Sequence, residues 1–311
     1  MDIAHSKAVA DMQAANQSVG SHVRTYHYSC PICRKGAVNY KFTTNGFTIV
    51  KCPSCKLMFV KEKLSQQELD YYYGKNTEDT DTDDDFVYLN QENIGNLNYY
   101  YRNLRSLILE RISTGSILDI GCSGGYFLDV MEGFKLFGVE RSPGHGKIAK
   151  RKYGDNIFIG AFEEYKPPDF LFDCISIQDV LDHMVDPLGA LKKCNKLLKP
   201  GGTLVVKVHD MSSLYAKIMG RNFYAFIPPR HLFFFNRFSI AMALKEASFD
   251  IVLSKHMAHL MFLSTIIYRL SREDQRSIFF HLYKLIKGTC LGHLKIYKNL
   301  HEIITILAIK K

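Results

Sequence analysis

Four of the eight cysteines fall into two close pairs, Cys30-Pro-Ile-Cys33 and Cys52-Pro-Ser-Cys55, with 18 residues between them. A C-x-x-C pair forms a tight knuckle that directs two sulfurs at one ion, and four thiolates complete a tetrahedral zinc site. Asn45-Gly46 suits a tight hairpin turn, and we expect strands at 38–42 and 47–50 on either side of it. The pattern predicts a zinc ribbon whose metal is structural, because four protein sulfurs leave no open position for chemistry.

A second group of residues combines a glycine-rich turn with a spaced acid. In Ile117-Leu-Asp119-Ile-Gly121-Cys-Ser123-Gly-Gly125, an apolar strand ends at Asp119 and turns through small residues, which let a ligand approach the backbone closely. Glu140 follows Asp119 by 21 residues, at the end of the next expected strand. An acid at that place binds ribose hydroxyls in dinucleotide folds, so the group predicts an adenosine-containing cofactor.

Two histidines and an arginine are candidates for handling a second substrate. His231 lies in the aromatic loop at 228–236, and a histidine with a pKa near neutrality suits a general base. His183 is expected at the carboxyl end of another strand. Arg230 has the charge to pair with a substrate phosphate or carboxylate. The alternatives are structural roles for both histidines and a surface charge for Arg230.

The elements that must position these residues alternate along the chain. An amphipathic helix is expected from Leu97. Further strands are predicted at 116–120, 136–139, 156–159, 174–177, 203–208 and 251–254, and further helices from Tyr126 and at 147–153, 188–198 and 236–249. This alternation is typical of an α/β fold in which helices cover both faces of a parallel sheet.

The glycine-rich turn resembles the first motif of the class I S-adenosylmethionine-dependent methyltransferases, Asp-x-Gly-x-Gly-x-Gly, with Ser123 in place of the middle glycine. The resemblance covers about residues 97–311. It implies a Rossmann-like, seven-stranded, mostly parallel sheet whose last strand, at 303–309, is antiparallel, with the small zinc ribbon placed before it. The positions that it implies for the cofactor are Asp119, Gly121, Ser123, Gly125, Glu140, Ala161, Phe162 and Gln178.

A ribbon before such a domain, together with the loop at 228–236, is similar to bacterial methyltransferases of cell-surface polysaccharide and deoxysugar pathways. This finer resemblance implies a sugar, sugar nucleotide or lipid-linked saccharide as the acceptor. In the sugar C-methyltransferase branch the loop carries Glu-His, and here Arg230 replaces the acid, so transfer to a sugar oxygen is equally open. The roles implied are catalysis by His231 and His183 and substrate binding by Arg230 and Tyr101.

Two other functions remain open at this point. The first is an RNA methyltransferase that binds RNA through the ribbon and a basic surface, and the formal net charge of +9 favours an anionic partner of some kind. The second is a methyltransferase-like binding module without catalysis.

The 311 residues, 47% of them hydrophobic, suit one catalytic domain with a small added module. We expect a flexible leader at 1–28, the ribbon at 29–62, a linker at 63–96 and the catalytic domain at 97–311. The linker should hold a short helix capped at Ser65 and an acidic loop at 76–85.

A basic insertion is expected at 255–302, with helices at 257–270 and 277–287. It would be a substrate lid, a dimer face, a peripheral membrane contact or helices packed on the core. The first 20 residues do not form a signal peptide, and no apolar run is long enough to span a membrane, so we expect a cytoplasmic protein.

Overall fold

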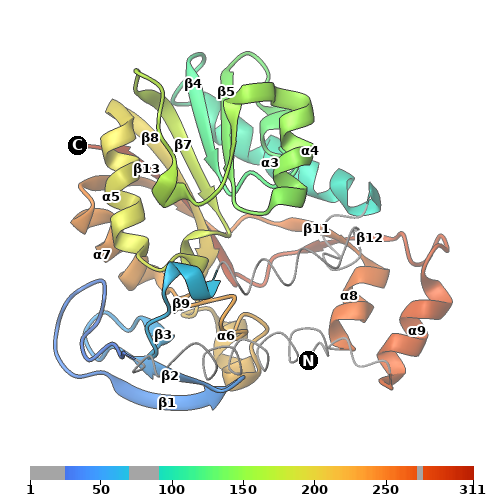
Figure 1. Cartoon of the computed structure of the whole chain (residues 1–311). Coiled ribbons are helices and arrows are strands. Elements are labelled where there is room, and N and C mark those ends of the chain that lie inside the picture. Colours follow the sequence, from blue (N-terminus) through green and yellow to red (C-terminus); the bar gives the residue numbers. More distant parts are fainter. Residues whose placement is uncertain (1–24, 70–90, 272–275) are drawn as a thin grey trace.

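The computed structural model describes residues 25–69, 91–271 and 276–311 (Figure 1). Residues 1–24 of the leader predicted at 1–28 and the predicted acidic loop at 76–85 lie outside the described residues. Part of the predicted leader, however, belongs to the ribbon, because Tyr26 forms a bridge with Glu62 and the backbone N–H of His27 donates to the carbonyl of Lys61.

The centre of the molecule is a seven-stranded sheet in the order β10-β13-β8-β7-β4-β5-β6. Only β13 runs against its neighbours, β8 and β10. This confirms the predicted α/β, Rossmann-like class with an antiparallel last strand. The strand bounds are β4 (Ser116–Ile120), β5 (Lys135–Glu140), β6 (Ile157–Ile159), β7 (Phe172–Gln178), β8 (Leu198–His209), β10 (Phe249–Lys255) and β13 (Ile303–Lys310).

Helices cover both faces of this sheet, which explains why all five residues of β4 are buried. In Figure 1, α3 (Gln91–Leu109) and α4 (Pro143–Tyr153) lie on one side, and α5 (Pro187–Leu197) and α7 (Arg237–Glu246) lie on the other. The N-terminus of α7 is fixed by a capping box between Asn236 and Ser239.

The helix predicted from Tyr126 was wrong. The structure has only a short 3-10 turn there, η2 (Leu128–Val130). The reason is length: 14 residues join β4 to β5, and these must contain both the glycine-rich turn and the return to the sheet.

The first helix predicted in the insertion was also partly wrong. Residues 259–262 form a strand, β11 (His259–Phe262), which pairs antiparallel with β12 (Lys295–Lys298). Only the later part is helical, as α8 (Leu263–Leu270), and the second predicted helix is present as α9 (Ile278–Ile286). The distant partner strand decides the conformation, and local periodicity could not show it.

The predicted hairpin is present as β1 (Asn39–Thr44) and β2 (Phe47–Lys51). Asn45 and Gly46 both have positive φ, 48° and 74°, as the predicted tight turn requires. Two further strands extend it into a four-stranded sheet, β3 (Met58–Val60) and β9 (Phe233–Phe234). The last of these belongs to the catalytic domain, so the ribbon and the domain share one sheet.

The remaining elements are short. They are α6 (Leu214–Met219) and the 3-10 turns η3 (Gly154–Asn156), η4 (Phe162–Glu164), η5 (Leu181–His183) and η6 (Gly220–Asn222). Within the described residues, none of the helices combines the length and apolarity needed to traverse a lipid bilayer.

Candidate active site

The two cysteine knuckles bring four sulfurs together. The Sγ atoms of Cys30 and Cys55 are 3.5 Å apart, as are those of Cys33 and Cys52, and one atom from each residue lies within 4.8 Å of the others. A tetrahedral zinc ion with bonds of roughly 2.3 Å holds its sulfurs roughly 3.8 Å apart, so the cluster fits such an ion.

The backbone of each knuckle supports the same conclusion. Arg34 and Lys56, which follow the second cysteine of each pair, both take positive φ, 55° and 62°. Their N–H groups donate to the carbonyls of Cys30 and Cys52 at 2.9 and 3.1 Å. Two segments far apart in sequence therefore adopt the same turn, as expected for two halves of one metal site.

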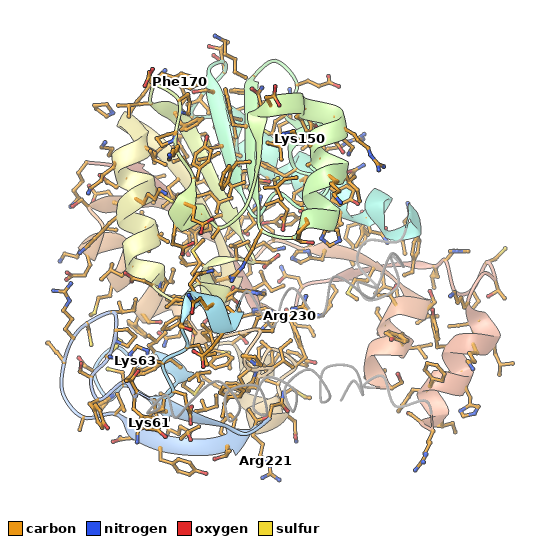
Figure 2. The ribbon with its side chains drawn as sticks, viewed as in Figure 1. Lys61, Lys63, Lys150, Phe170, Arg221 and Arg230 are labelled. Carbon is orange, nitrogen blue, oxygen red and sulfur yellow. The ribbon has the colours of Figure 1, made fainter. Side chains whose placement is uncertain are left out.

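The ribbon is bonded to the loop that carries Arg230 and His231. Strand β3 pairs with β9, and the N–H of Val60 donates to the carbonyl of Leu232 at 2.9 Å. From the hairpin turn, Asn45 Nδ2 donates to the carbonyl of Pro228 at 3.2 Å. Figure 2 shows Arg230 between the carboxyl ends of the central strands and the ribbon. The ribbon thus supports one wall of the site.

A cavity of about 270 Å³ opens at the carboxyl ends of β4, β5 and β7. It brings together residues from the glycine-rich turn, the ends of three neighbouring strands and the loop at 228–236. Of the predicted site residues, Gly121, Ser123, Glu140, Ala161, Phe162, Gln178, His183 and Arg230 line it.

The glycine-rich turn forms the floor of the cavity. Gly121 has φ +75°, and a Cβ there would lie 2.2 Å from Val180 Cγ2, so only glycine fits. Ser123, which replaces the family's glycine, takes a φ of 48°, the left-handed conformation for which glycine is usual. Ser123 therefore adopts the backbone conformation that a glycine would take at this position.

Glu140 lies at the end of β5 and is fixed by two backbone donors. Its Oε2 accepts from the N–H of Ser123 and its Oε1 from the N–H of Ser142, both at 2.7 Å. Burial raises the pKa of Glu140, and the backbone hydrogen bonds oppose this. The carboxylate is thereby held at the cavity wall, where an acid would meet the ribose of an adenosine cofactor.

The hydroxyl of Ser123 and Oε1 of Gln178 are buried in this cavity and have no hydrogen-bond partner among the described residues. Buried polar groups are rarely left unsatisfied, so these atoms fit a site that receives polar groups from a ligand. Ala161 and Phe162 line the wall next to Glu140, beside the end of β6. The cavity thus suits S-adenosylmethionine on the chemistry of its own residues.

Four of the predicted residues do not line the cavity. Asp119 is buried beneath the turn, where burial raises its pKa to about 8. A Cβ at Gly125 would meet the Tyr153 ring at 2.7 Å, so this glycine serves packing. The ring of Tyr101 packs on Phe127, 5.7 Å between centroids. The fourth, His231, lies behind the cavity wall.

His183 belongs to a cluster of three histidines and one acid at that wall, in which Asp182 and His231 are buried and His183 and His209 are partly buried. The rings of His183 and His231 meet edge to face with centroids 4.5 Å apart, and His209 lies 5.3 Å from His231. Nδ1 of His209 is 3.3 Å from Oδ2 of Asp182, and Nε2 of His183 is 3.7 Å from its Oδ1. Oδ1 of Asp182 has no hydrogen-bond partner among the described residues.

The charges within the cluster follow from its burial. Burial lowers the pKa of His183 to about 4, although Asp182 opposes the shift. Burial also lowers the pKa of His231 well below its usual value. For Asp182 burial acts upward, but the neighbouring histidines outweigh it and hold the pKa well below the usual range. At neutral pH Asp182 is therefore ionised, and His183 and His231 are neutral.

His231 is held in one tautomer. Its Nδ1 lies 2.7 Å from the carbonyl of Ala225, so Nδ1 carries the proton and donates it, and Nε2 is left with a lone pair. Asp182, His209 and His231 each present one ligand atom within 4.8 Å of the others, a spacing that a metal ion could also use. The Asp182–His209 contact, at 3.3 Å, is a long hydrogen bond.

The sequence did not mark every residue of the site. Asp182 and His209 complete the histidine cluster, while Gln66, Arg141 and Asp179 line the cavity. The motif around His183 contained a signal for Asp182. No local pattern marks Gln66, which lines the cavity from the short helix after the ribbon. No local pattern marks His209 either, because it lies at the end of β8 and contacts Asp182 only once the strands are paired in the sheet.

Comparisons with known proteins agree with this geometry. The family described as a methyltransferase domain matches residues 94–254, slightly more than half of the chain. A ubiquinone biosynthesis O-methyltransferase of Histophilus somni is 25% identical over 155 residues, which is 46% of this chain and 63% of that protein. One of Vibrio cholerae is 29% identical over 132 residues, 39% of this chain and 51% of that protein. The chain therefore spans less than two thirds of the length of these relatives.

Among solved structures, a protein of Bacillus halodurans described as a methyltransferase aligns with a TM-score of 0.50 and 15% sequence identity. The alignment covers 67% of this chain and 98% of that one, and it shows the shared fold alone. The fold, the cavity at its carboxyl edge and the family match over residues 94–254 agree, and the chain belongs to the methyltransferase-domain family.

Proposed function

We propose that this protein is an S-adenosylmethionine-dependent methyltransferase and that it methylates an oxygen atom of a small molecule that carries an anionic group. The observation that carries the proposal is that one cavity is lined both by the glycine-rich turn with Glu140 and by His183 and Arg230. A cofactor bound along the turn would have a titratable imidazole and a guanidinium at the same opening. These two groups suit an acceptor with a hydroxyl to deprotonate and a phosphate or carboxylate to bind.

His183 is the group we propose as the base. It lines the cavity, whereas His231, the base preferred from the sequence, lies behind it. Because burial keeps the imidazole neutral, His183 is ready to accept the hydroxyl proton as the oxygen attacks. Nε2 lies 3.7 Å from Oδ1 of Asp182, so the positive charge gained by the ring faces an ionised carboxylate. We assign His231 to positioning the His183 ring through their edge-to-face contact.

S-adenosylmethionine, when bound, supplies a methyl group activated by a sulfonium charge. The chain supplies alignment, since an in-line displacement depends on holding the two reacting atoms in a narrow geometry. Gly121, Ser123, Glu140 and Gln178 would hold the cofactor, and Arg230 would orient the acceptor. We further propose that the four-cysteine cluster holds a structural zinc ion, because four sulfurs leave it no catalytic position.

The class of acceptor requires a direct test. The carbohydrate acceptor expected from the sequence has no support in the comparisons. The names of the relatives describe O-methyl transfer in ubiquinone biosynthesis, which supports oxygen as the acceptor atom. A sugar phosphate and an aromatic hydroxyl beside a carboxylate share the chemistry that Arg230 and His183 would recognise.

The experiment is methyl transfer from methyl-labelled cofactor by the purified, zinc-loaded protein. The acceptors are nucleotide sugars, catechol carboxylates and RNA, each with the Arg230→Ala variant in parallel. We expect label in one of the two small-molecule groups, with a KM that rises in the variant. Label in RNA alone, or a KM that Arg230→Ala leaves unchanged, would overturn the proposal.

A further inference from the structure

The segment at 64–69, which follows the ribbon, forms part of the active-site cavity. Gln66 lines this cavity, and all the other described residues that line it lie between Ile120 and Arg230. In Figure 1 the short light-blue helix after β3 lies between the ribbon and the carboxyl ends of the central strands. The proposed function gives this segment no role, although it contributes a polar side chain to the place where a cofactor would bind.

The segment is anchored on both sides of Gln66. Leu64 and Leu69 are buried in the apolar cluster that also contains the core of the ribbon. Between them a capping box fixes the first turn of the helix. The hydroxyl of Ser65 accepts from the N–H of Glu68 at 3.2 Å, and Oε2 of Glu68 accepts from the N–H of Ser65 at 2.7 Å. The position of Gln66 therefore depends on the core of the ribbon.

Gln66 contacts Arg141, the residue directly after Glu140. With its side-chain oxygen facing the guanidinium, Gln66 accepts hydrogen bonds from Nη1 and Nη2 of Arg141 at 3.1 and 2.6 Å. Nη2 also lies 3.4 Å from the backbone carbonyl of Gln66. A guanidinium presents its donors in one plane, so acceptors at one edge fix its orientation. The segment after the ribbon thereby orients a side chain that lines the cavity next to the acid proposed to hold the ribose.

This contact connects occupancy of the cavity with the order of the segment. A cofactor beside Glu140 would meet the wall formed by Gln66 and Arg141, so it binds best when both side chains are in place. Binding that depends on an ordered segment stabilises that segment by the same free energy, because the coupling between two equilibria is reciprocal.

We propose that Gln66 is a cofactor-binding residue supplied by the segment after the ribbon, and that its contact with Arg141 couples cofactor binding to the order of that segment. The inference rests on the proposed function, because the ligand it concerns is S-adenosylmethionine or its demethylated product. It gives the ribbon a second task, support of the cofactor side of the cavity, besides its contact with the acceptor loop through Asn45.

The test is isothermal calorimetry of S-adenosylhomocysteine, the demethylated product, with the full, zinc-loaded chain. Gln66→Ala removes the side-chain acceptor of two hydrogen bonds and should raise the dissociation constant about three- to tenfold. Gln67→Ala is the matched control, because the same residue type stands next to Gln66 in the same turn with an exposed side chain. This variant should bind the product as the parent protein does.

A double variant tests the route of the effect. Gln66→Ala/Arg141→Met should bind the product no more weakly than Arg141→Met alone, since each change removes the same contact. Additive losses would show that the two residues act independently and would contradict the coupling.

Hydrogen exchange separates the coupling from a simple loss of contact. At saturating product, peptides that cover 60–69 should exchange more slowly than in the free protein, in the parent and in Gln67→Ala. In Gln66→Ala this protection should be lost even when the cavity is filled. Circular dichroism checks that each variant is folded.

The outcomes distinguish this inference from the proposed function. Equal dissociation constants for the two glutamine variants, or protection of 60–69 that Gln66→Ala retains, would overturn the role of Gln66 and leave the proposed function intact. A parent protein that does not bind the product would overturn both.

Discussion

His183 is the residue whose environment most directly links geometry to chemistry. It is partly buried, neutral at physiological pH and placed between the cavity and Asp182. Replacing His183 by alanine should lower kcat by about 10²- to 10⁴-fold, the usual contribution of a general base. Cofactor affinity, measured by calorimetry, should change little. His281→Ala, an exposed histidine on α9, is the control. A kcat within threefold of the parent protein would exclude His183 as the base.

The pH dependence of turnover follows from the same burial. Because the pKa of His183 is lowered from 6.5 to about 4, the imidazole stays neutral as the pH falls and is protonated only near pH 4. We therefore expect kcat to stay level down to about pH 5 and then to fall. A decline centred near pH 6.5 would show an unperturbed histidine as the base.

The stability of the fold changes in the same pH window. Between about pH 6.5 and pH 4 the unfolded chain binds a proton at His183 that the folded chain does not, so stability falls as the pH falls. Urea midpoints measured by circular dichroism at each pH separate this effect from the loss of turnover.

Two glycines allow backbone strain and steric clash to be separated. Gly121 and Gly201 have similar φ values, +75° and +72°, but a Cβ at Gly121 meets Val180 at 2.2 Å and one at Gly201 meets nothing within 4 Å. Gly201→Ala should cost about 1–2 kcal/mol of stability from its left-handed backbone and leave cofactor affinity intact. Gly121→Ala should cost more and also weaken cofactor binding. Equal effects in urea unfolding and calorimetry would mean that the turn adapts to the side chain.

At the scale of elements, hydrogen bonds from the ribbon hold the loop that carries Arg230 in position. Asn45 of the hairpin turn donates to Pro228, two residues from Arg230. Removing one such bond with Asn45→Ala should raise the acceptor KM about two- to tenfold and leave cofactor affinity unchanged. Asn39→Ala, on the exposed start of the same hairpin, is the control. If both variants behave alike in steady-state kinetics, the ribbon does not position the acceptor loop.

At the scale of the whole molecule, the ribbon and the catalytic domain share one apolar core. Buried ribbon residues such as Phe47 and Ile49 belong to the same apolar cluster as Ile175 and Val206 of the central sheet. The two parts also share the β3–β9 pairing. A domain boundary at residue 62, as expected from the sequence, separates segments of the chain that share one core.

Such a shared core should unfold cooperatively. The zinc-loaded protein should show one thermal transition, with coincident midpoints by circular dichroism and by fluorescence of its 18 tyrosines, since tryptophan is absent. Chelation of the metal should lower this single midpoint. Two separated transitions in the loaded protein would contradict the shared core.

The sequence by itself determined the elements whose signals are local. Asn45-Gly46 fixed a hairpin because the two residues tolerate positive φ, and the capping residues Ser65 and Asn236 marked where helices begin. The apolar runs and the spacing from Asp119 to Glu140 identified the fold class and one side of the cavity, because the carboxyl ends of parallel strands meet at one edge.

Tertiary structure decided whatever depends on distant partners. In the folded structure Gln66 lines the cavity. Four residues predicted to belong to the site do not line it: Asp119, Gly125, Tyr101 and His231. Tertiary structure also joined β9 to the ribbon and formed β11 from residues predicted to be helical. The physical reason is the same in each case: side-chain burial and strand pairing depend on neighbours that are close in space and far apart along the chain.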